Sequence, residues 1–459
     1  MATGIPNSNK AMNGGRNGHR ANAPGPVALS YPGKKNAAGI LATPPAKYSL
    51  AWQSGTAGTN TLYYGENLGI LAALLREPGV RGNVRLIYID PPYATRSVFQ
   101  SRKQVDAYND LLAGADYLEF LRERLILMRE LLASDGSIYV HLDENMAFQA
   151  KVLMDEIFGP SNFRNWLTRK KCNPKNYTRK TYGNVADYIL FYTKTDNYVW
   201  HRPVEMWSDK RAAQEYSYIE PQTGRRYKKV PVHAPGVRNG ETGKLWRGKL
   251  PPPGKHWQYP PATLDEMDAR GEIYWSPTGN PRRKIYLDQS NGVPVQDIWM
   301  EFRDAHNQNI RITGYPTEKN SAMLARIIAA SSDTGDLVLD CFSGSGTTLE
   351  AAHRMGRRWI GVDNSPEAIR TTLARFASGV APMGDFVSTD DDVQGKHKRH
   401  KLNGANDDDF LPLPGLDDSA FAQVLEDCNV RHAPITDFRL CVAEGLQSEE
   451  LELTAKSNA

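Results

Sequence analysis

Cysteine is scarce in this sequence of 459 residues, and no two of its cysteines form a C-x-x-C pair. The four lie far apart, at Cys172, Cys341, Cys428 and Cys441. This pattern disfavours a zinc ribbon or a disulfide scaffold, and it fits a reducing compartment. No apolar run approaches the roughly 18 residues of a membrane span, and no apolar core follows the basic residues near the N-terminus. These absences predict a soluble, cytoplasmic protein with no metal site and no membrane contact.

Positive charge is concentrated in one part of an otherwise nearly neutral chain. The formal net charge is only +4, yet residues 161–260 hold 20 lysines and arginines against seven aspartates and glutamates, a net charge of +13. Aromatic residues interleave with these bases, which argues against disorder. A basic block of this size favours contact with nucleic acid, with an affinity that falls as salt is added.

A buried strand is predicted over residues 84–89, where an apolar run leads directly into Asp90. Pro91 and Pro92 end this strand, because proline has no N–H to donate. The Asp90 carboxylate then faces outward at the carboxyl end of the strand, where open α/β sheets bind their ligands. A carboxylate and a backbone carbonyl can accept both N–H bonds of an exocyclic amine, while the ring of Tyr93 covers a flat heterocycle.

Other periodic segments frame this strand. Apolar residues at helical spacing over 117–132 predict a crossover helix, and residues 138–143 and 187–194 predict further strands, the second near the edge of the sheet. We assign mainly structural roles to His141 and Asp143, which lie at the end of the first of these two strands.

A second strand-and-turn unit begins about 250 residues after the first motif. A strand over 337–340 ends in Asp340, a glycine turn follows over 341–348, and a helix leads to a strand that ends in Asp363. Glycines let the backbone approach a ligand, and a carboxylate at the second strand end can hold the hydroxyl groups of a ribose. The turn lacks the third glycine of the dinucleotide fingerprint, which argues against an NAD-linked dehydrogenase.

In this order the two motifs resemble the β class of amino-group DNA methyltransferases, which methylate the N6 amine of adenine or the N4 amine of cytosine. The tetrapeptide Asp90-Pro91-Pro92-Tyr93 resembles the catalytic motif of the class. Residues 340–346 resemble the D-x-F-x-G-x-G loop of S-adenosylmethionine (SAM) enzymes, with Cys341 in place of the usual proline. Residues 60–200 are also similar to modification subunits of type III restriction systems.

The resemblance implies SAM as the cofactor, with Asp340 on the methionine amino group and Asp363 on the ribose. The implied cofactor residues of this loop and strand are Asp340, Phe342, Ser343, Gly344, Ser345, Gly346, Thr347 and Asp363. Upstream, Thr317 and Lys319 resemble a T-x-K-P element and would face the SAM carboxylate, unless they simply begin a helix. Asn67 matches an acid or asparagine beside the cofactor, and an asparagine-capped helix start is the alternative.

The resemblance also implies the reaction. Asp90, Pro91, Pro92 and Tyr93 would hold a base flipped out of the duplex. Aspartate at the first position favours N6-adenine. An N4-cytosine enzyme and a catalytically inactive DNA-binding subunit of a restriction-modification complex are the alternatives. Double-stranded DNA is the expected partner at the prokaryotic nucleoid, and a homodimer and a restriction subunit are further partners left open.

The expected fold class is α/β: a Rossmann-like SAM-dependent methyltransferase sheet flanked by helices, with an inserted basic target-recognition region. We expect a disordered tail over 1–46, a catalytic half over 47–200, a target-recognition insert over 201–300, a SAM-binding half over 301–378, a charged linker over 379–409 and a small helical appendage over 410–459. The candidate DNA-binding residues are Arg164, Arg169, Lys170, Lys171, Lys175, Arg179, Lys180, Arg225, Arg226, Lys228 and Lys229.

Overall fold

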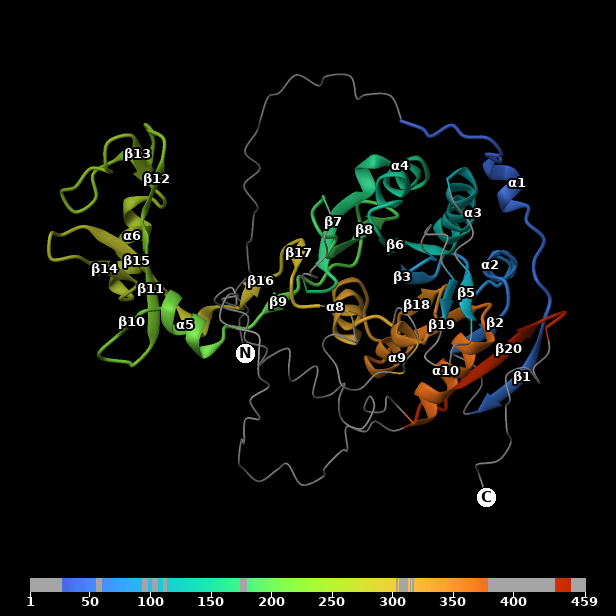
Figure 1. The fold of residues 1–459 in the computed structure, drawn as a ribbon. Coiled ribbons are helices and arrows are strands. Elements are labelled where there is room, and N and C mark those ends of the chain that lie inside the picture. The colour runs from blue at the N-terminus through green and yellow to red at the C-terminus, as the bar shows by residue number, and fades with distance from the viewer. Residues whose placement is uncertain are drawn as a thin grey trace, which may run out of the picture.

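A large mixed β-sheet organises the part of the chain that the computed structural model describes. The described residues are 27–54, 60–92, 98–100, 106–109, 114–173, 180–302, 304, 313, 315, 318–378 and 434–446. Helices cover both faces of the sheet, and a smaller unit projects from one edge (Figure 1). None of the helices within these ranges is both long and apolar enough to cross a bilayer.

The sheet has ten strands, and six consecutive strands within it are parallel. From edge to edge they are β1 (Tyr48–Ser54), β20 (Phe438–Ala443), β2 (Thr61–Tyr64), β19 (Arg358–Asp363), β18 (Leu337–Asp340), β3 (Val84–Ile89), β6 (Leu132–Leu142), β8 (Ala186–Thr193), β7 (Phe163–Lys170) and β17 (Ile298–Trp299). β1 and β8 run antiparallel to their neighbours. Because β2, β18, β3 and β19 run in parallel, their carboxyl ends meet along one edge of the sheet.

Helices cover both faces of the central strands, which explains why the sequences of these strands are continuous apolar runs. One face packs against α1 (Ala37–Leu41), α2 (Asn67–Leu74), α3 (Ala115–Leu131) and α4 (Ala147–Phe158), the last followed by the 3-10 turn η1 (Pro160–Asn162). The other face packs against α8 (Ser321–Ser331), α9 (Thr347–Arg354) and α10 (Pro366–Ser378). A strand buried on both faces gains nothing from polar alternation, and all four residues of β18 are buried. Between β3 and α3 in sequence, two short strands, β4 (Val98–Gln100) and β5 (Asp106–Asn109), pair with each other.

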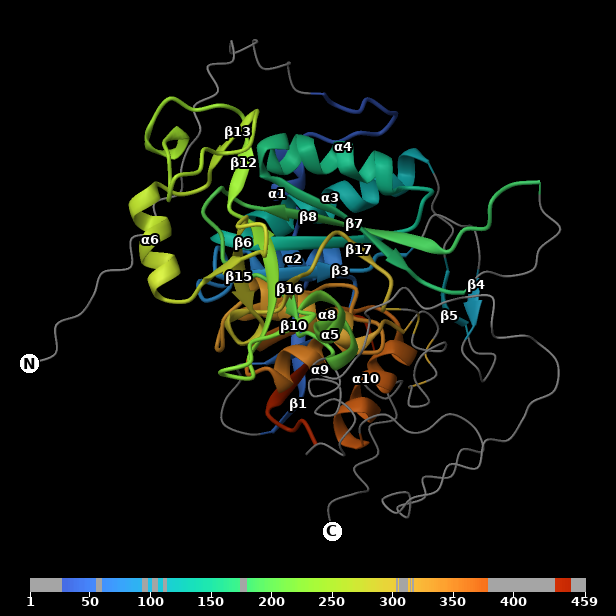
Figure 2. The same ribbon diagram turned by 90° about the vertical axis from the view of Figure 1, so that its left-hand side faces the viewer.

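The insert folds as a separate unit between the paired strands β9 (Val204–Glu205) and β16 (Val293–Pro294). Its elements are α5 (Asp209–Glu215), β10 (Tyr218–Ile219), β11 (Arg226–Pro231), β12 (His233–Pro235), η2 (Glu241–Gly243), β13 (Lys255–Trp257), α6 (Pro261–Ala269), β14 (Ile273–Trp275), β15 (Pro281–Tyr286) and η3 (Leu287–Gln289). Trp246, Trp257 and Leu264 are among the residues of its own small core. Figures 1 and 2 show the insert beside the β17 edge of the main sheet.

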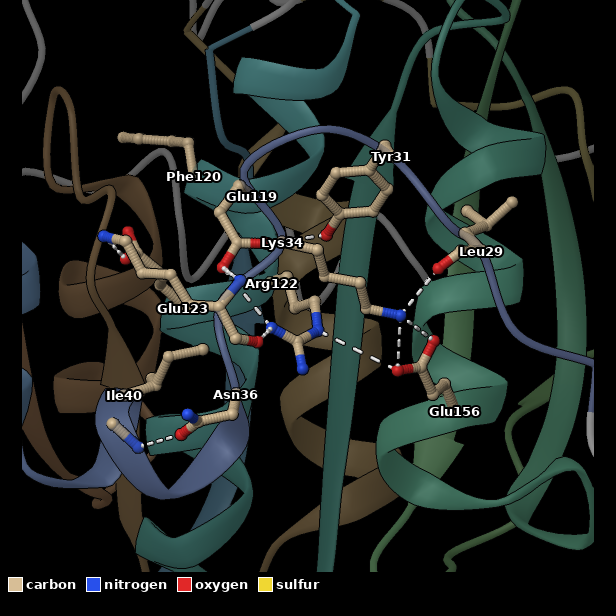
Figure 3. Close-up of polar contacts among 12 residues, drawn as sticks. Leu29, Tyr31, Lys34, Asn36, Ile40, Glu119, Phe120, Arg122, Glu123 and Glu156 are labelled. Atoms are coloured by element: carbon tan, nitrogen blue, oxygen red, sulfur yellow. Dashed lines mark hydrogen bonds and ion pairs between the residues drawn. The ribbon is translucent and has the colours of Figure 1, made fainter.

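The prediction of a disordered tail over 1–46 is wrong for residues 27–46, which pack along α3 and α4 (Figure 3). The Tyr31 hydroxyl donates a hydrogen bond to Glu119 over 2.7 Å, and the Lys34 ammonium lies 2.8 Å from a carboxylate oxygen of Glu156. Ile40 is buried in the core. The composition of this segment suggested disorder because most of the partners that order it lie 80 or more residues away in sequence. Residues 1–26 lie outside the described ranges.

The C-terminal prediction also needs correction, because residues 438–443 do not form part of a helical appendage. They form β20, which pairs in parallel with β2 and antiparallel with β1. β20 therefore completes the main sheet, with Leu440 fully buried. The strand predicted over 187–194 is present as β8, but β7 and β17 lie beyond it, so it is further from the edge than expected. The linker predicted over 379–409 lies outside the described residues.

Candidate active site

Three carboxylates come together at the ends of three neighbouring strands. Asp90 follows β3 directly, Asp340 ends β18, and Asp363 ends β19. β18 lies between the other two strands in the sheet (Figure 1). All three residues line one cavity of about 750 Å³, a volume that includes the solvent at its mouth.

The cavity contains most of the residues that the two motifs predicted. Those that line it are Asp90, Pro91, Pro92, Lys319, Asp340, Phe342, Ser343, Gly344, Ser345, Thr347 and Asp363. Stretches some 250 residues apart in sequence therefore form a single site. Tyr93 and Thr317, which were predicted to belong to it, lie outside the described residues.

Glycine conformations shape the turn between β18 and α9. Gly346 has φ of 74°, and a Cβ there would lie 2.7 Å from the Thr372 side chain. Gly344 also has positive φ, and its N–H donates to Asp363 Oδ2 over 2.8 Å. The Phe342 N–H donates to Asp340 Oδ1 over 3.0 Å. Residues with side chains would strain this turn, so the glycines keep the loop close to both carboxylates.

Burial makes the two carboxylates of the cofactor end unusual. Desolvation raises the pKa of Asp340 to about 7 and that of Asp363 to about 6. Such groups gain from a cation or from hydroxyl donors that stabilise their charged form. Ser343 Oγ is buried here, and among the described residues it has no hydrogen-bond partner. An amino cation, two ribose hydroxyls and a further polar group would complete these contacts, so the residues fit a nucleoside cofactor with an amino-acid moiety.

Lys319 lies in the cavity, but it contacts a different group from the one expected. Its ammonium lies 2.7 Å from Asp90 Oδ2, so it pairs with the predicted catalytic carboxylate. The sequence had placed it toward the cofactor carboxylate. Asn320, the next residue, caps α8 by accepting hydrogen bonds from the N–H groups of Ala322 and Met323. The helix cap thus fixes the backbone that carries Lys319 to the Asp90 side of the cavity.

Asn67 supports the cofactor loop from behind and is not one of the residues that line the cavity. Its Nδ2 donates to the Cys341 carbonyl over 2.8 Å, and its Oδ1 accepts from Arg124 over 2.6 Å. The cap of α2 is Glu66 rather than Asn67. Both sequence interpretations of Asn67, as a cofactor ligand and as a helix cap, are therefore replaced by an indirect role.

Sequence reasoning missed several residues of the cavity wall: Tyr88, Tyr315, Glu318, Leu324, Thr348 and Asn364. A signal existed for Tyr88, because alternate residues of a strand point to the same face, and Asp90 is two residues further on. Glu318 is held by Arg375, which also donates to the Ser345 carbonyl over 2.7 Å. No local pattern connects Arg375 to the loop, because the contact depends on how α10 packs.

The candidate DNA-binding residues fall into two groups. Arg169 is fully buried and pairs with Asp187 and Asp304, so its prediction as a DNA contact is wrong. Several others already have an acidic partner: Arg164 with Asp196, Lys171 with Glu144 at 4.0 Å, Arg225 with Asp288, and Lys228 with Glu215.

The remaining candidates are more accessible. Lys180 and Arg226 are exposed, and Lys170 is half-buried. Lys229 Nζ lies 3.5 Å from the ring centroids of both Tyr218 and Tyr274. Lys175 and Arg179 lie outside the described residues.

Comparisons with known proteins identify the family of this chain. The DNA methylase family model matches residues 84–374, which span the catalytic motif, the insert and the cofactor loop. The type II methyltransferase M.EcaI of Enterobacter cloacae is 50% identical over 368 residues, which cover 79% of this chain and 80% of that protein. The StyLTI Mod subunit, from a type III restriction-modification enzyme of Salmonella typhimurium, is 28% identical over 335 residues. That match covers 64% of this chain but only 49% of the subunit.

Among solved structures, the cytosine-N4-specific PvuII DNA methyltransferase aligns with a TM-score of 0.38 and 14% identity, covering 74% of this chain and 92% of that one. The family model covers well over half of this chain, and the identity to M.EcaI extends over most of both proteins. The chain therefore belongs to the DNA methylase family, the amino-group methyltransferases that act on N6 or N4 amines of DNA bases.

Proposed function

We propose that this protein transfers the methyl group of SAM to the N6 amine of adenine in DNA. The observation that carries the proposal is the single cavity shared by Asp90, Asp340 and Asp363. It provides an acceptor for an amine next to a site that fits a nucleoside cofactor. Adenine is preferred to cytosine because the motif begins with aspartate, and we infer that the reaction serves a restriction-modification system.

The residues of the chain have distinct parts in this reaction. Bound SAM supplies a methyl group attached to a positively charged sulfur. The sulfur is the leaving group, and it departs as a neutral thioether. Asp340 would hold its amino group, and Asp363 its ribose. Asp90 and the Pro91 carbonyl would accept the two N–H bonds of a flipped base, while Tyr93 would stack on its ring. The amine nitrogen would form a bond to the methyl carbon as the carbon–sulfur bond breaks and its electron pair stays on sulfur, and the nitrogen would release one proton to solvent. Positioning of the two reactants provides most of the rate gain.

The experiment that tests the function uses the full chain, an unmodified plasmid and SAM labelled in its methyl group. The DNA is then digested to nucleosides, and the modified positions are mapped by sequencing. We expect labelled N6-methyl-2′-deoxyadenosine at one short sequence. Labelled N4-methyl-2′-deoxycytidine would replace the adenine assignment, and no label in DNA would support an inactive DNA-binding subunit instead.

One face of the insert sheet is our candidate for the DNA backbone contact. Directly opposed residues of antiparallel strands share a face, and the register places Lys229 opposite Lys284, and Arg282 opposite both Pro231 and Tyr274. Tyr218, Tyr227 and Tyr286 form another row on the same face. In the described part of the chain Glu220 pairs with Lys284, but no carboxylate pairs with Arg282. Tyr227 and Tyr286 are buried beneath this face, and Tyr218 is exposed on it. Basic side chains beside an exposed aromatic ring fit a nucleic acid.

We expect the double substitution Lys229→Gln and Arg282→Gln to weaken DNA binding by about tenfold at low salt, without regard to sequence. Each lost phosphate contact should reduce the dependence of log affinity on log salt by about 0.9. Fluorescence anisotropy at several salt concentrations measures both effects. Arg270→Gln is the matched control, because Arg270 is an arginine of the same insert that pairs with Glu272. Equal affinity and slope for the double variant and the control would contradict this assignment.

A further inference from the structure

A row of buried polar side chains crosses the sheet from the exit of the insert to the cavity. The Tyr88 hydroxyl lies 2.8 Å from His141 Nδ1, and His141 Nε2 lies 3.0 Å from Asp187 Oδ2. Arg169 donates to the same Asp187 oxygen over 2.8 Å. With its other nitrogens Arg169 donates to the Phe302 carbonyl and to Asp304 Oδ1, both over 2.6 Å.

The row takes one side chain from each of four neighbouring strands. Tyr88 belongs to β3, His141 to β6, Asp187 to β8 and Arg169 to β7, which are consecutive in the sheet. Asp304 lies beyond β17, on the chain that returns from the insert. At its inner end, Tyr88 lines the cavity two residues before Asp90. The row of close polar contacts therefore links the segment that follows β17 to the catalytic strand.

Stability alone does not account for this row. Tyr88, His141, Asp187 and Arg169 are all almost completely buried. Burial by itself would raise the pKa of Asp187, but His141 and Arg169 outweigh it and keep that pKa below its usual value. Well-packed apolar residues are often at least as stabilising as buried ion pairs of this kind. Buried charged groups that extend to a ligand cavity are candidates for function.

We propose that the row from Asp304 to Tyr88 positions the wall of the transfer cavity relative to the returning end of the insert. The inference rests on the proposed methyl transfer and adds positioning residues to it. The His141 contact fixes the Tyr88 hydroxyl, and Tyr88 fixes the strand end that carries Asp90. Arg169 joins this end to the segment that leaves the insert. DNA held by the insert then presents its base to a carboxylate in a fixed place.

The test uses the two ends of the row in the full-length protein. Asp304→Asn changes an oxygen of a carboxylate that is 38% exposed, and Tyr88→Phe removes one hydroxyl without changing the packing volume. We expect each variant to lower kcat on the mapped DNA site at least tenfold. Affinities for SAM and DNA, measured by calorimetry and anisotropy, should change less than about twofold. Distant sites that act independently multiply their effects on kcat. If the row acts as one unit, breaking its second end adds nothing, so the double variant should be no slower than the slower single variant.

Asp196→Asn is the matched control, because Asp196 pairs with another arginine of β7, Arg164, at 2.9 Å. It should keep the wild-type kcat. The proposal is overturned if Asp304→Asn behaves like this control, or if the effects of the two substitutions on kcat simply multiply. Absence of methylation by the unaltered protein would instead reject the proposed function, so the two failures can be told apart.

Discussion

Replacing Asp90 by alanine should lower the rate of methyl transfer by about a thousandfold and leave SAM binding nearly unchanged. Asp90 directly follows the catalytic strand β3 and lines the cavity. Lys319 pairs with its carboxylate at 2.7 Å. Removing one such preorganised electrostatic group from an active site costs about 10² to 10³ in rate, and here the amine also loses its orientation. Transfer of labelled methyl groups to DNA measures the rate, and calorimetry measures the cofactor affinity.

Asp143→Ala is the matched control, because Asp143 follows β6, the parallel strand next to β3. Asp143 is buried, it bonds to Asn145, and it is not one of the cavity residues. This control should keep a transfer rate within a few-fold of the unaltered protein. A wild-type rate for Asp90→Ala would remove Asp90 from the catalytic role. A large loss of SAM affinity would assign it to the cofactor site instead.

The sequence predicted the strand ends of the site because each is fixed by short-range chemistry. An apolar run buried on both faces, followed by proline or glycine, has few conformations open to it. Asp90, Asp340 and Asp363 were identified in this way, and the structure brings all three to one cavity. Parallel pairing of β18 and β19 follows from the short βαβ connection through α9, whereas the pairing of β3 with β18 joins segments about 250 residues apart.

The remaining features depend on contacts between distant segments. Arg169 was counted among the DNA-binding bases, because a charge count does not show which arginine is buried beside Asp187. Lys319 was placed by its motif, yet its partner is decided by where α8 begins. β20 is a short apolar segment, and it forms a strand because it pairs with β1 on one side and with β2 on the other. In each case the tertiary partner, not the local pattern, determines the role.

Arg375→Met should lower the free energy of unfolding by about 3 kcal/mol. The arginine is fully buried, and it donates to the Ser345 carbonyl, to Glu350 at 2.7 Å and to Glu318. Breaking a buried ion pair by removing one partner typically costs about 3–5 kcal/mol, because a charge is left without compensation. The lower end applies because Arg354 still pairs with Glu350. Urea denaturation followed by circular dichroism measures the loss.

Arg270→Met is the control for this substitution, since Arg270 pairs with Glu272 on the surface and surface pairs contribute little. Adding Glu318→Gln and Glu350→Gln to Arg375→Met should recover much of the lost stability, because no buried carboxylate then lacks its partner. A single variant as stable as the control would mean that the two glutamates do not need Arg375. The cofactor loop would then be held by its glycine turn and by its contacts with Asp340, Asp363 and Asn67, and the Arg375 contact to the Ser345 carbonyl would be incidental.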